Sequence, residues 1–105
     1  MSTATYAGRA VEVDAEGFLT DTSSWDAELA RAIAAENGIP ELTERHWQVV
    51  DFMRRTYLET GSAPSIRSLG KLSGVPIKEL YQLFPKGPAK LAAKIAGIPK
   101  PRGCI

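Results

Sequence analysis

Glycine and proline interrupt the apolar pattern along the chain, and these interruptions divide it into separate helices. Between the interruptions, apolar residues recur every three or four positions, which is the spacing of amphipathic helices. The pattern predicts five helices, with Pro88 suited to the first turn of the last one. The first helix begins after Ser23 or Ser24 and ends at Asn37–Gly38, and the second runs from Thr43 to about Thr60, with Gly61 as the stop. The third runs from Ser65 to Leu72, the fourth carries residues 80–84 before Pro85, and the fifth runs from Pro88 to Ala96.

Residues 6–19 predict a small β-hairpin. Val11 and Val13 alternate with polar residues, and a turn at residues 15–17 precedes Phe18 and Leu19. Residues 1–5 are expected to be a frayed end. An isolated hairpin is marginally stable, so its apolar side chains should pack on the helices. The predicted fold class is mainly α with a small N-terminal β-hairpin (α+β), forming one compact helical domain over residues 1–97 with one modest core.

After Gly97 the apolar periodicity stops, and Pro99 and Pro101 fix an extended course. Residues 98–105 therefore predict a flexible C-terminal arm that carries Cys104, the one cysteine of the chain. Eight residues at about 3.3 Å each give this arm a reach of roughly 26 Å. Gly103 would let the backbone beside the thiol enter a narrow channel.

Composition excludes several classes of protein. The chain is 44% hydrophobic and 24% charged, as in ordinary folded proteins. Residues 1–25 lack the pattern of a secretory signal, and no run of about 18 apolar residues predicts a membrane span. One cysteine forms no internal disulfide, and no Cys/His cluster has metal-ligand spacing. We expect a cytoplasmic protein with a reduced thiol and no metal. The sequence predicts that His46 is a surface or helix-packing residue and that Trp25, Trp47 and Tyr57 are core residues.

Charge is distributed unevenly along the chain. Residues 1–53 hold three Lys/Arg and ten Asp/Glu, whereas residues 54–105 hold ten Lys/Arg and two Asp/Glu. The basic half predicts an acidic partner, either nucleic acid or the acidic face of a protein. Attraction between the two halves within one molecule explains the same asymmetry, and both readings stay open.

Residues 65–84 have the proportions of a helix-turn-helix unit, with the turn at residues 73–75. If the second helix read duplex DNA, its outer face would offer Lys78, Glu79 and Gln82. Two helices packed at a glycine turn are also a common structural unit. The competing functional reading is therefore a DNA-binding regulator whose Cys104 senses redox state.

The thiol of Cys104 lies near cations, which favour the nucleophilic thiolate. In an extended segment Lys100, Arg102 and Cys104 project to one side, because side chains two apart share a face. The carboxylate expected on Ile105 opposes their effect. The arrangement suits a swinging carrier that inserts its tip into a partner; the alternative is an incidental thiol on a chain end, where changes are tolerated.

The run LYQLFPKGPAKLAAKIAGIPKPRGCI, at residues 80–105, resembles the C-terminal signature of the DsrC/TusE family of sulfur-relay proteins. Further matches are DAEGFL (14–19), SSWDAELA (23–30) and LTERHWQVVDFMRRTYLETGSAPSIRSL (42–69). The resemblance extends in order from about Gly8. It implies a helical domain with an N-terminal hairpin and a flexible C-terminal arm.

The resemblance also implies a function for Cys104. In this family the penultimate cysteine accepts a sulfane sulfur as a persulfide, so the covalent sulfur is the only cofactor expected. The chain is then a sulfur carrier, a protein substrate in a relay more than a free-standing enzyme. The implied donor is TusBCD- or DsrEFH-like, and the implied acceptor is a tRNA thiolase, for 2-thiouridine, or a sulfite reductase.

Two positions bear on the branch of the family. The DsrC branch usually has a second arm cysteine eleven positions earlier, where this chain has Ala93, which leaves a single-site persulfide carrier. Gly103 is typical of the sulfite-reductase branch, and the segment from Leu72 to Leu80 is short for the family.

Residues predicted to shape the arm or dock partners are Gly97, Pro99, Lys100, Pro101, Arg102, Gly103 and Ile105, with a possible basic surface at Arg67, Lys86 and Lys90.

Overall fold

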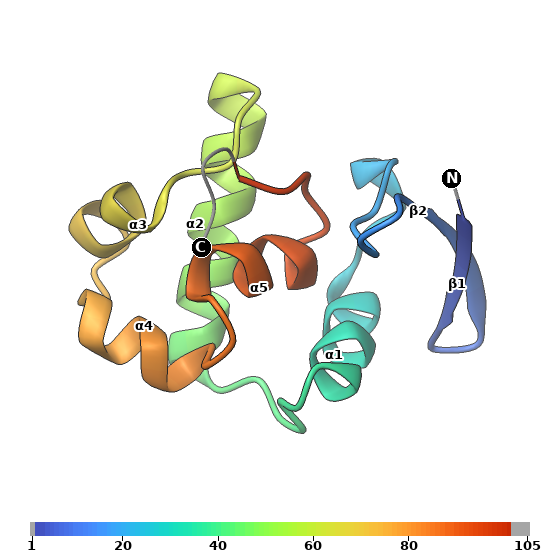
Figure 1. Ribbon diagram of the computed structural model, residues 1–105, viewed down its shortest axis with the longest axis horizontal. Helices are drawn as coiled ribbons and strands as arrows, with labels where there is room; N and C mark the ends of the chain where they lie inside the picture. The colour runs from blue at the N-terminus through green and yellow to red at the C-terminus, as the bar shows by residue number, and fades with distance from the viewer. Residues whose placement is uncertain (1, 102–105) are drawn as a thin grey trace.

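The computed structural model describes residues 2–101 of the chain (Figure 1). An antiparallel hairpin at the N-terminus is followed by a short 3-10 turn and five α-helices, so the predicted fold class is confirmed. The elements in chain order are β1 (Ser2–Tyr6), β2 (Arg9–Val13), η1 (Thr22–Ser24), α1 (Ala27–Glu36), α2 (Glu44–Thr60), α3 (Ile66–Leu72), α4 (Ile77–Leu83) and α5 (Pro88–Ile95).

The helix boundaries follow the capping residues in the sequence. The Thr43 side chain accepts from the His46 N–H at the start of α2, and Ser65 accepts from the Ser68 N–H at the start of α3. Gly61 ends α2 in the left-handed conformation. The two predicted caps and the predicted stop are confirmed.

The first helix begins later than the sequence predicted. Asp21 caps the 3-10 turn η1, and Asp26 caps α1 by accepting from the Leu29 N–H. Because these two carboxylates bind the free N–H groups, the serines do not start α1. Trp25 therefore lies in the connection between η1 and α1.

The predicted hairpin had the wrong partner strand. Residues 2–6, expected to be frayed, form β1 and pair with β2 from Ser2↔Val13 to Tyr6↔Arg9. The connection is a two-residue turn in which Ala7 and Gly8 both have positive φ, as such tight turns require. Alternation marked β2 correctly but did not reveal which neighbouring segment would pair with it.

The turn expected at residues 15–17 is present in a different role. The Asp14 side chain accepts from the N–H groups of Glu16 and Phe18, which brings the chain back toward β2. Leu19 then pairs with Val13 in a single bridge. This tight loop, residues 14–18, reaches the C-terminal part of the molecule.

Helix α5 is the centre of the fold. It packs against each of the four other α-helices, and Figure 1 shows it between α1 on one side and α3 and α4 on the other. A helix that is apolar on most of its circumference belongs in a core. Its buried residues are Pro88, Ala89, Leu91, Ala92, Ala93 and Ile95. Whatever follows α5 thus leaves directly from the core.

The segment after α5 continues this packing. Ile98 has none of its surface exposed, and Pro101 is also buried. Pro99 between them is exposed, and Lys100 is half-buried. The domain boundary predicted between residues 97 and 98 and the independent movement of residues 98–105 stay predictions. Over residues 2–101, no helix is both long and apolar enough to cross a membrane.

Candidate functional site

The end of α5 is held by two side chains from distant parts of the sequence. The Trp25 indole donates from Nε1 to the carbonyl oxygen of Ile95 at 2.7 Å. Arg54 on α2 donates from Nη1 to the carbonyl oxygen of Ala96 at 2.8 Å. The last carbonyls of a helix have no partner within the helix, so these donors satisfy groups that would otherwise be unpaired.

Trp25 and Arg54 also hold each other. The Arg54 guanidinium lies over the Trp25 ring at 4.1 Å from its centroid, and a second bond from Nη1 reaches Thr22 Oγ1 at 3.1 Å. Burial lowers the pKa of Arg54, opposed by nearby Asp51, but a guanidinium stays protonated in proteins. A cation at a helix C-terminus is favourable as well. We call Trp25 and Arg54 the clamp.

Gly97 allows the chain to turn away from α5 beneath the clamp. Its φ is +69°, and its N–H and that of Ile98 bond back to the carbonyls of Lys94 and Ala93 at 3.2 Å each. A Cβ atom at this position would lie 2.7 Å from Trp25 Cγ and 2.9 Å from Trp25 Cβ. Glycine is therefore required here both by conformation and by space.

An ion pair fixes the next part of the segment. Lys100 Nζ donates to the two carboxylate oxygens of Glu16 at 2.9 and 3.1 Å, and Lys90 Nζ lies 3.5 Å from the same carboxylate. The hydrogen bond from Lys100 is the main cause that lowers the pKa of Glu16. Glu16 belongs to the loop at residues 14–18, so the N-terminal part of the chain contacts the C-terminal segment.

A surface pocket of about 140 Å³ lies beside this segment. It is lined by Tyr57, Gly61, Ser62, Ala63, Pro99 and Lys100. The end of α2 and the loop that leads into α3 therefore flank residues 99 and 100. Cys104 follows Pro101 by three residues in the sequence and lies outside the described residues.

The predicted site residues are only partly brought together. Gly97, Pro99, Lys100 and Pro101 form one continuous segment at the end of α5, and Lys90 shares Glu16 with Lys100. Arg102, Gly103, Cys104 and Ile105 lie outside the described residues.

The basic surface predicted at Arg67, Lys86 and Lys90 is spread over several elements. Arg67 is exposed on α3, and Lys86 is exposed between α4 and α5. Their part in docking stays a prediction.

Sequence reasoning did not identify the clamp. Trp25 was read as a core residue, and Arg54 was not singled out. One signal was available: a tryptophan in or near a core needs an acceptor for its indole N–H. The sequence does not reveal which carbonyl accepts it.

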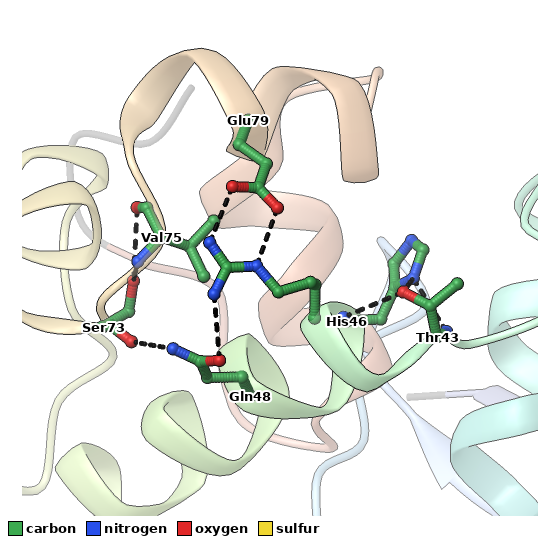
Figure 2. Close-up of polar contacts among 7 residues, drawn as sticks. Thr43, His46, Gln48, Ser73, Val75 and Glu79 are labelled. Atoms are coloured by element: carbon green, nitrogen blue, oxygen red, sulfur yellow. Dashed lines mark hydrogen bonds and ion pairs between the residues drawn. The ribbon is translucent and has the colours of Figure 1, made fainter.

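The helix-turn-helix-like unit is present as α3 and α4, and it is fastened to α2 (Figure 2). Arg45 on α2 donates to Glu79 through Nε at 2.8 Å and Nη2 at 2.7 Å. Gln48 donates to the carbonyl oxygen of Ser73, in the turn between α3 and α4, at 2.8 Å. Glu79, predicted as an outward reader of DNA, is instead bound to Arg45, and this bond lowers the pKa of Glu79.

His46 is a helix-packing residue, one of the two roles expected for it. Its Nδ1 accepts from the Thr43 N–H at 3.0 Å, and its Nε2 lies 3.0 Å from the carbonyl oxygen of Leu83. The hydrogen therefore resides on Nε2, which donates to α4. The ring also meets Phe84 edge to face. Within residues 2–101, no group of three or more His, Cys, Asp and Glu side chains is placed to hold a metal ion.

Together, these features define a class of protein: a small helical domain whose core helix runs directly into a C-terminal segment held by contacts from three regions of the chain. The family model for DsrC like protein matches residues 5–105. Relatives at more than 40% identity match along nearly the whole length. The chain belongs to the DsrC-like family.

Two relatives represent the two branches considered above. Sulfurtransferase TusE of Salmonella typhimurium is 49% identical over 107 residues, covering 95% of this chain and 97% of that protein. The gamma subunit of dissimilatory-type sulfite reductase of Nitratidesulfovibrio vulgaris is 41% identical over 105 residues, covering all of both chains.

Solved structures give the same result. A chain in the crystal structure of dissimilatory sulfite reductase I (DsrI) superposes with a TM-score of 0.87 at 40% identity, covering 99% of this chain and 100% of that one. The oxidized gamma subunit (DsrC) from Archaeoglobus fulgidus superposes with a TM-score of 0.81 at 37% identity, with 99% and 100% coverage.

Proposed function

We propose that this protein is a sulfur carrier that accepts a sulfane sulfur as a persulfide on Cys104 and passes it to an acceptor protein. The observation that carries the proposal is family membership over the whole length, with relatives named as a sulfurtransferase and as a sulfite reductase subunit. The held segment at residues 97–101 supports it, because contacts from distant residues fix the chain as far as Lys100, four residues before the one cysteine.

The loading step is a nucleophilic displacement at sulfur. The Cys104 thiolate attacks the outer sulfur of a donor persulfide, R–S–SH, and forms a new S–S bond. The donor S–S bond breaks, and the donor leaves as the thiolate R–S⁻. The outer sulfur keeps its hydrogen, so Cys104 becomes a persulfide and no external oxidant or reductant is consumed.

Delivery reverses the roles. A thiolate of the acceptor attacks the outer sulfur of the Cys104 persulfide, and Cys104 returns as a thiolate. Position 93 supports a single-site carrier. It is occupied by Ala93, a fully buried residue of α5, and the chain has no second cysteine with which Cys104 could form a disulfide. A TusBCD- or DsrEFH-like donor and a tRNA thiolase or sulfite reductase acceptor fit this chemistry.

The test is intact-mass analysis after incubation with glutathione persulfide. Wild type should gain one sulfur atom, and the gain should be reversed by a thiol reductant. The matched control is Cys104→Ser, which has the same length and no thiol. A wild-type protein that gains no sulfur, or an equal gain in Cys104→Ser, contradicts the proposal.

A further inference from the structure

Helices α3 and α4 carry three exposed apolar side chains. Four large apolar residues of the described chain are strongly exposed, and three of them fall within ten residues: Leu72 at 67%, Ile77 at 43% and Tyr81 at 44%. The fourth, Leu58, lies on α2 at 68%. Single exposed apolar residues are ordinary, but a local group of them on a small domain indicates an interaction surface.

The backbone geometry fixes this group in place. Ile77 packs directly on the backbone of α3, since a methyl group added at Gly70 would overlap Ile77 Cγ1. Tyr81 lies one helical turn after Ile77 on the same side of α4. The bonds from Arg45 to Glu79 and from Gln48 to Ser73, drawn in Figure 2, hold both helices on α2. The surface is therefore preformed.

Two exposed lysines are next to these apolar residues in the sequence. Lys71 precedes Leu72, and Lys78 follows Ile77; both are exposed, and neither forms an ion pair within residues 2–101. Glu79, the one carboxylate of α3 and α4, is neutralised by Arg45. An apolar centre with a positive rim complements a protein face that has an apolar centre and carboxylates around it.

Nucleic acid fits this surface less well. Duplex readers place polar side chains against base edges, and phosphate binding needs cations rather than exposed leucine, isoleucine and tyrosine. Here the apolar residues occupy the end of α3 and one side of α4. The predicted reader Glu79 is bound to Arg45 of α2.

The loop before α3 lies beside part of the C-terminal segment. Residues 61–63, which lead into α3, line the same pocket as Pro99 and Lys100. Four residues of chain follow Pro101, and Cys104 is the third of them. The loop that leads into α3 therefore contacts the segment that precedes Cys104 in the sequence.

We propose that Leu72, Ile77 and Tyr81, with Lys71 and Lys78, form a docking surface for an apolar, carboxylate-rimmed face of the protein that delivers sulfur to Cys104. This inference rests on the proposed carrier function. Docking on α3 and α4 raises the local concentration of the donor persulfide near Cys104 without taking part in the S–S exchange.

The test compares two sulfur donors. One is glutathione persulfide, which needs no docking; the other is the purified, persulfide-loaded TusBCD- or DsrEFH-like complex of the same organism. Two double variants remove one feature each: Ile77→Ser with Tyr81→Ser, and Lys71→Glu with Lys78→Glu. Both should lower kcat/KM for loading by the protein donor about tenfold to a hundredfold, as interface hot spots do, and leave loading by glutathione persulfide unchanged.

Matched controls alter the same chemistry elsewhere. Leu58→Ser removes a leucine of α2 that is more exposed than Ile77 or Tyr81, and Arg31→Glu reverses an exposed charge on α1. Both should load like wild type from either donor. As salt is added, the difference in protein-donor loading rate between wild type and the Lys71→Glu, Lys78→Glu variant should become smaller, because salt screens the attraction that the wild-type lysines provide.

The outcomes separate the two proposals. If wild type takes no sulfur from glutathione persulfide, the carrier function fails and the docking proposal falls with it. If wild type loads from both donors and the double variants load equally well, the docking surface is refuted and the carrier function stands. The docking proposal is also refuted if wild type loads from glutathione persulfide alone, or if duplex DNA binds through Lys71 and Lys78 while protein-donor loading is unaffected.

Discussion

Replacing Gly97 with alanine should lower the free energy of unfolding by about 2–4 kcal/mol. Alanine in the left-handed conformation costs roughly 1 kcal/mol. The new methyl group would also lie 2.7 Å from Trp25 Cγ, and overpacking of this kind costs about 1–3 kcal/mol. Trp25 has little freedom to retreat, because its Nε1 bonds to Ile95 and the Arg54 guanidinium lies on its ring.

Gly38→Ala is the matched control for this prediction. Gly38 also follows a helix and has a φ of +89°, but a methyl group there would meet nothing within 4 Å. It should therefore cost only the conformational term, about 1 kcal/mol. Urea denaturation of both variants measures the difference as a shift of the midpoint at unchanged slope.

A double variant tests the cause. With Trp25→Gly already present, the three atoms nearest to the new methyl group at position 97, all of them in the Trp25 side chain, are gone, and Gly97→Ala should then cost about as much as Gly38→Ala. Equal costs for Gly97→Ala and Gly38→Ala in the otherwise wild-type protein would refute the reasoning, since they would mean that Trp25 yields freely and does not clamp the end of α5.

Two further predictions concern the contacts on either side of this point. Ile98→Ala should lower the free energy of unfolding by about 2–5 kcal/mol, because Ile98 is fully buried; a loss well under 1 kcal/mol in urea denaturation would show that residue 98 does not belong to the core. Arg45 lowers the pKa of Glu79 below its ordinary value. The pair therefore stabilises the folded protein at pH values above the pKa that Glu79 has in the unfolded chain, and this stabilisation is lost as the pH falls through the pKa of Glu79 in the folded protein. The stability gap between wild type and Glu79→Gln, measured by urea midpoints across pH, should therefore be widest near neutral pH and close on acidification; a gap that grows in acid would contradict this sign.

The sequence was sufficient for features that depend on neighbouring residues. Thr43, Gly61 and Ser65 act within one helical turn, so the limits of α2 and the start of α3 follow from local chemistry. The hairpin was different. Val11 and Val13 marked β2 by their alternation, but the choice between residues 2–6 and residues 18–19 as its partner depended on a turn at Ala7, which no local preference favours.

The candidate site likewise has one part that the sequence predicts and another that it does not. Cys104 and the glycines and prolines around it stand together in the sequence, so their importance could be predicted there. The contacts that hold residues 95–100 join positions far apart: Trp25 with Ile95 is a separation of 70 residues, and Glu16 with Lys100 one of 84. Such pairs arise from the packing of α5 among the other helices, and sequence spacing does not encode them.

The uneven charge of the chain is only partly balanced within the molecule. Among the described residues, Glu16 is the carboxylate of the acidic half that pairs with the basic half, through Lys90 and Lys100. The other ion pair between the halves runs the opposite way, since Arg45 of the acidic half neutralises Glu79 of the basic one.

That second pair makes the surface of α3 and α4 more positive. It removes the one negative charge beside Lys71 and Lys78 and leaves both lysines exposed. Attraction between the two halves therefore does not account for the charge on these helices. The docking proposal assigns this charge to an acidic partner, and the exposed Ile77 and Tyr81 make a protein a better candidate for that partner than a nucleic acid.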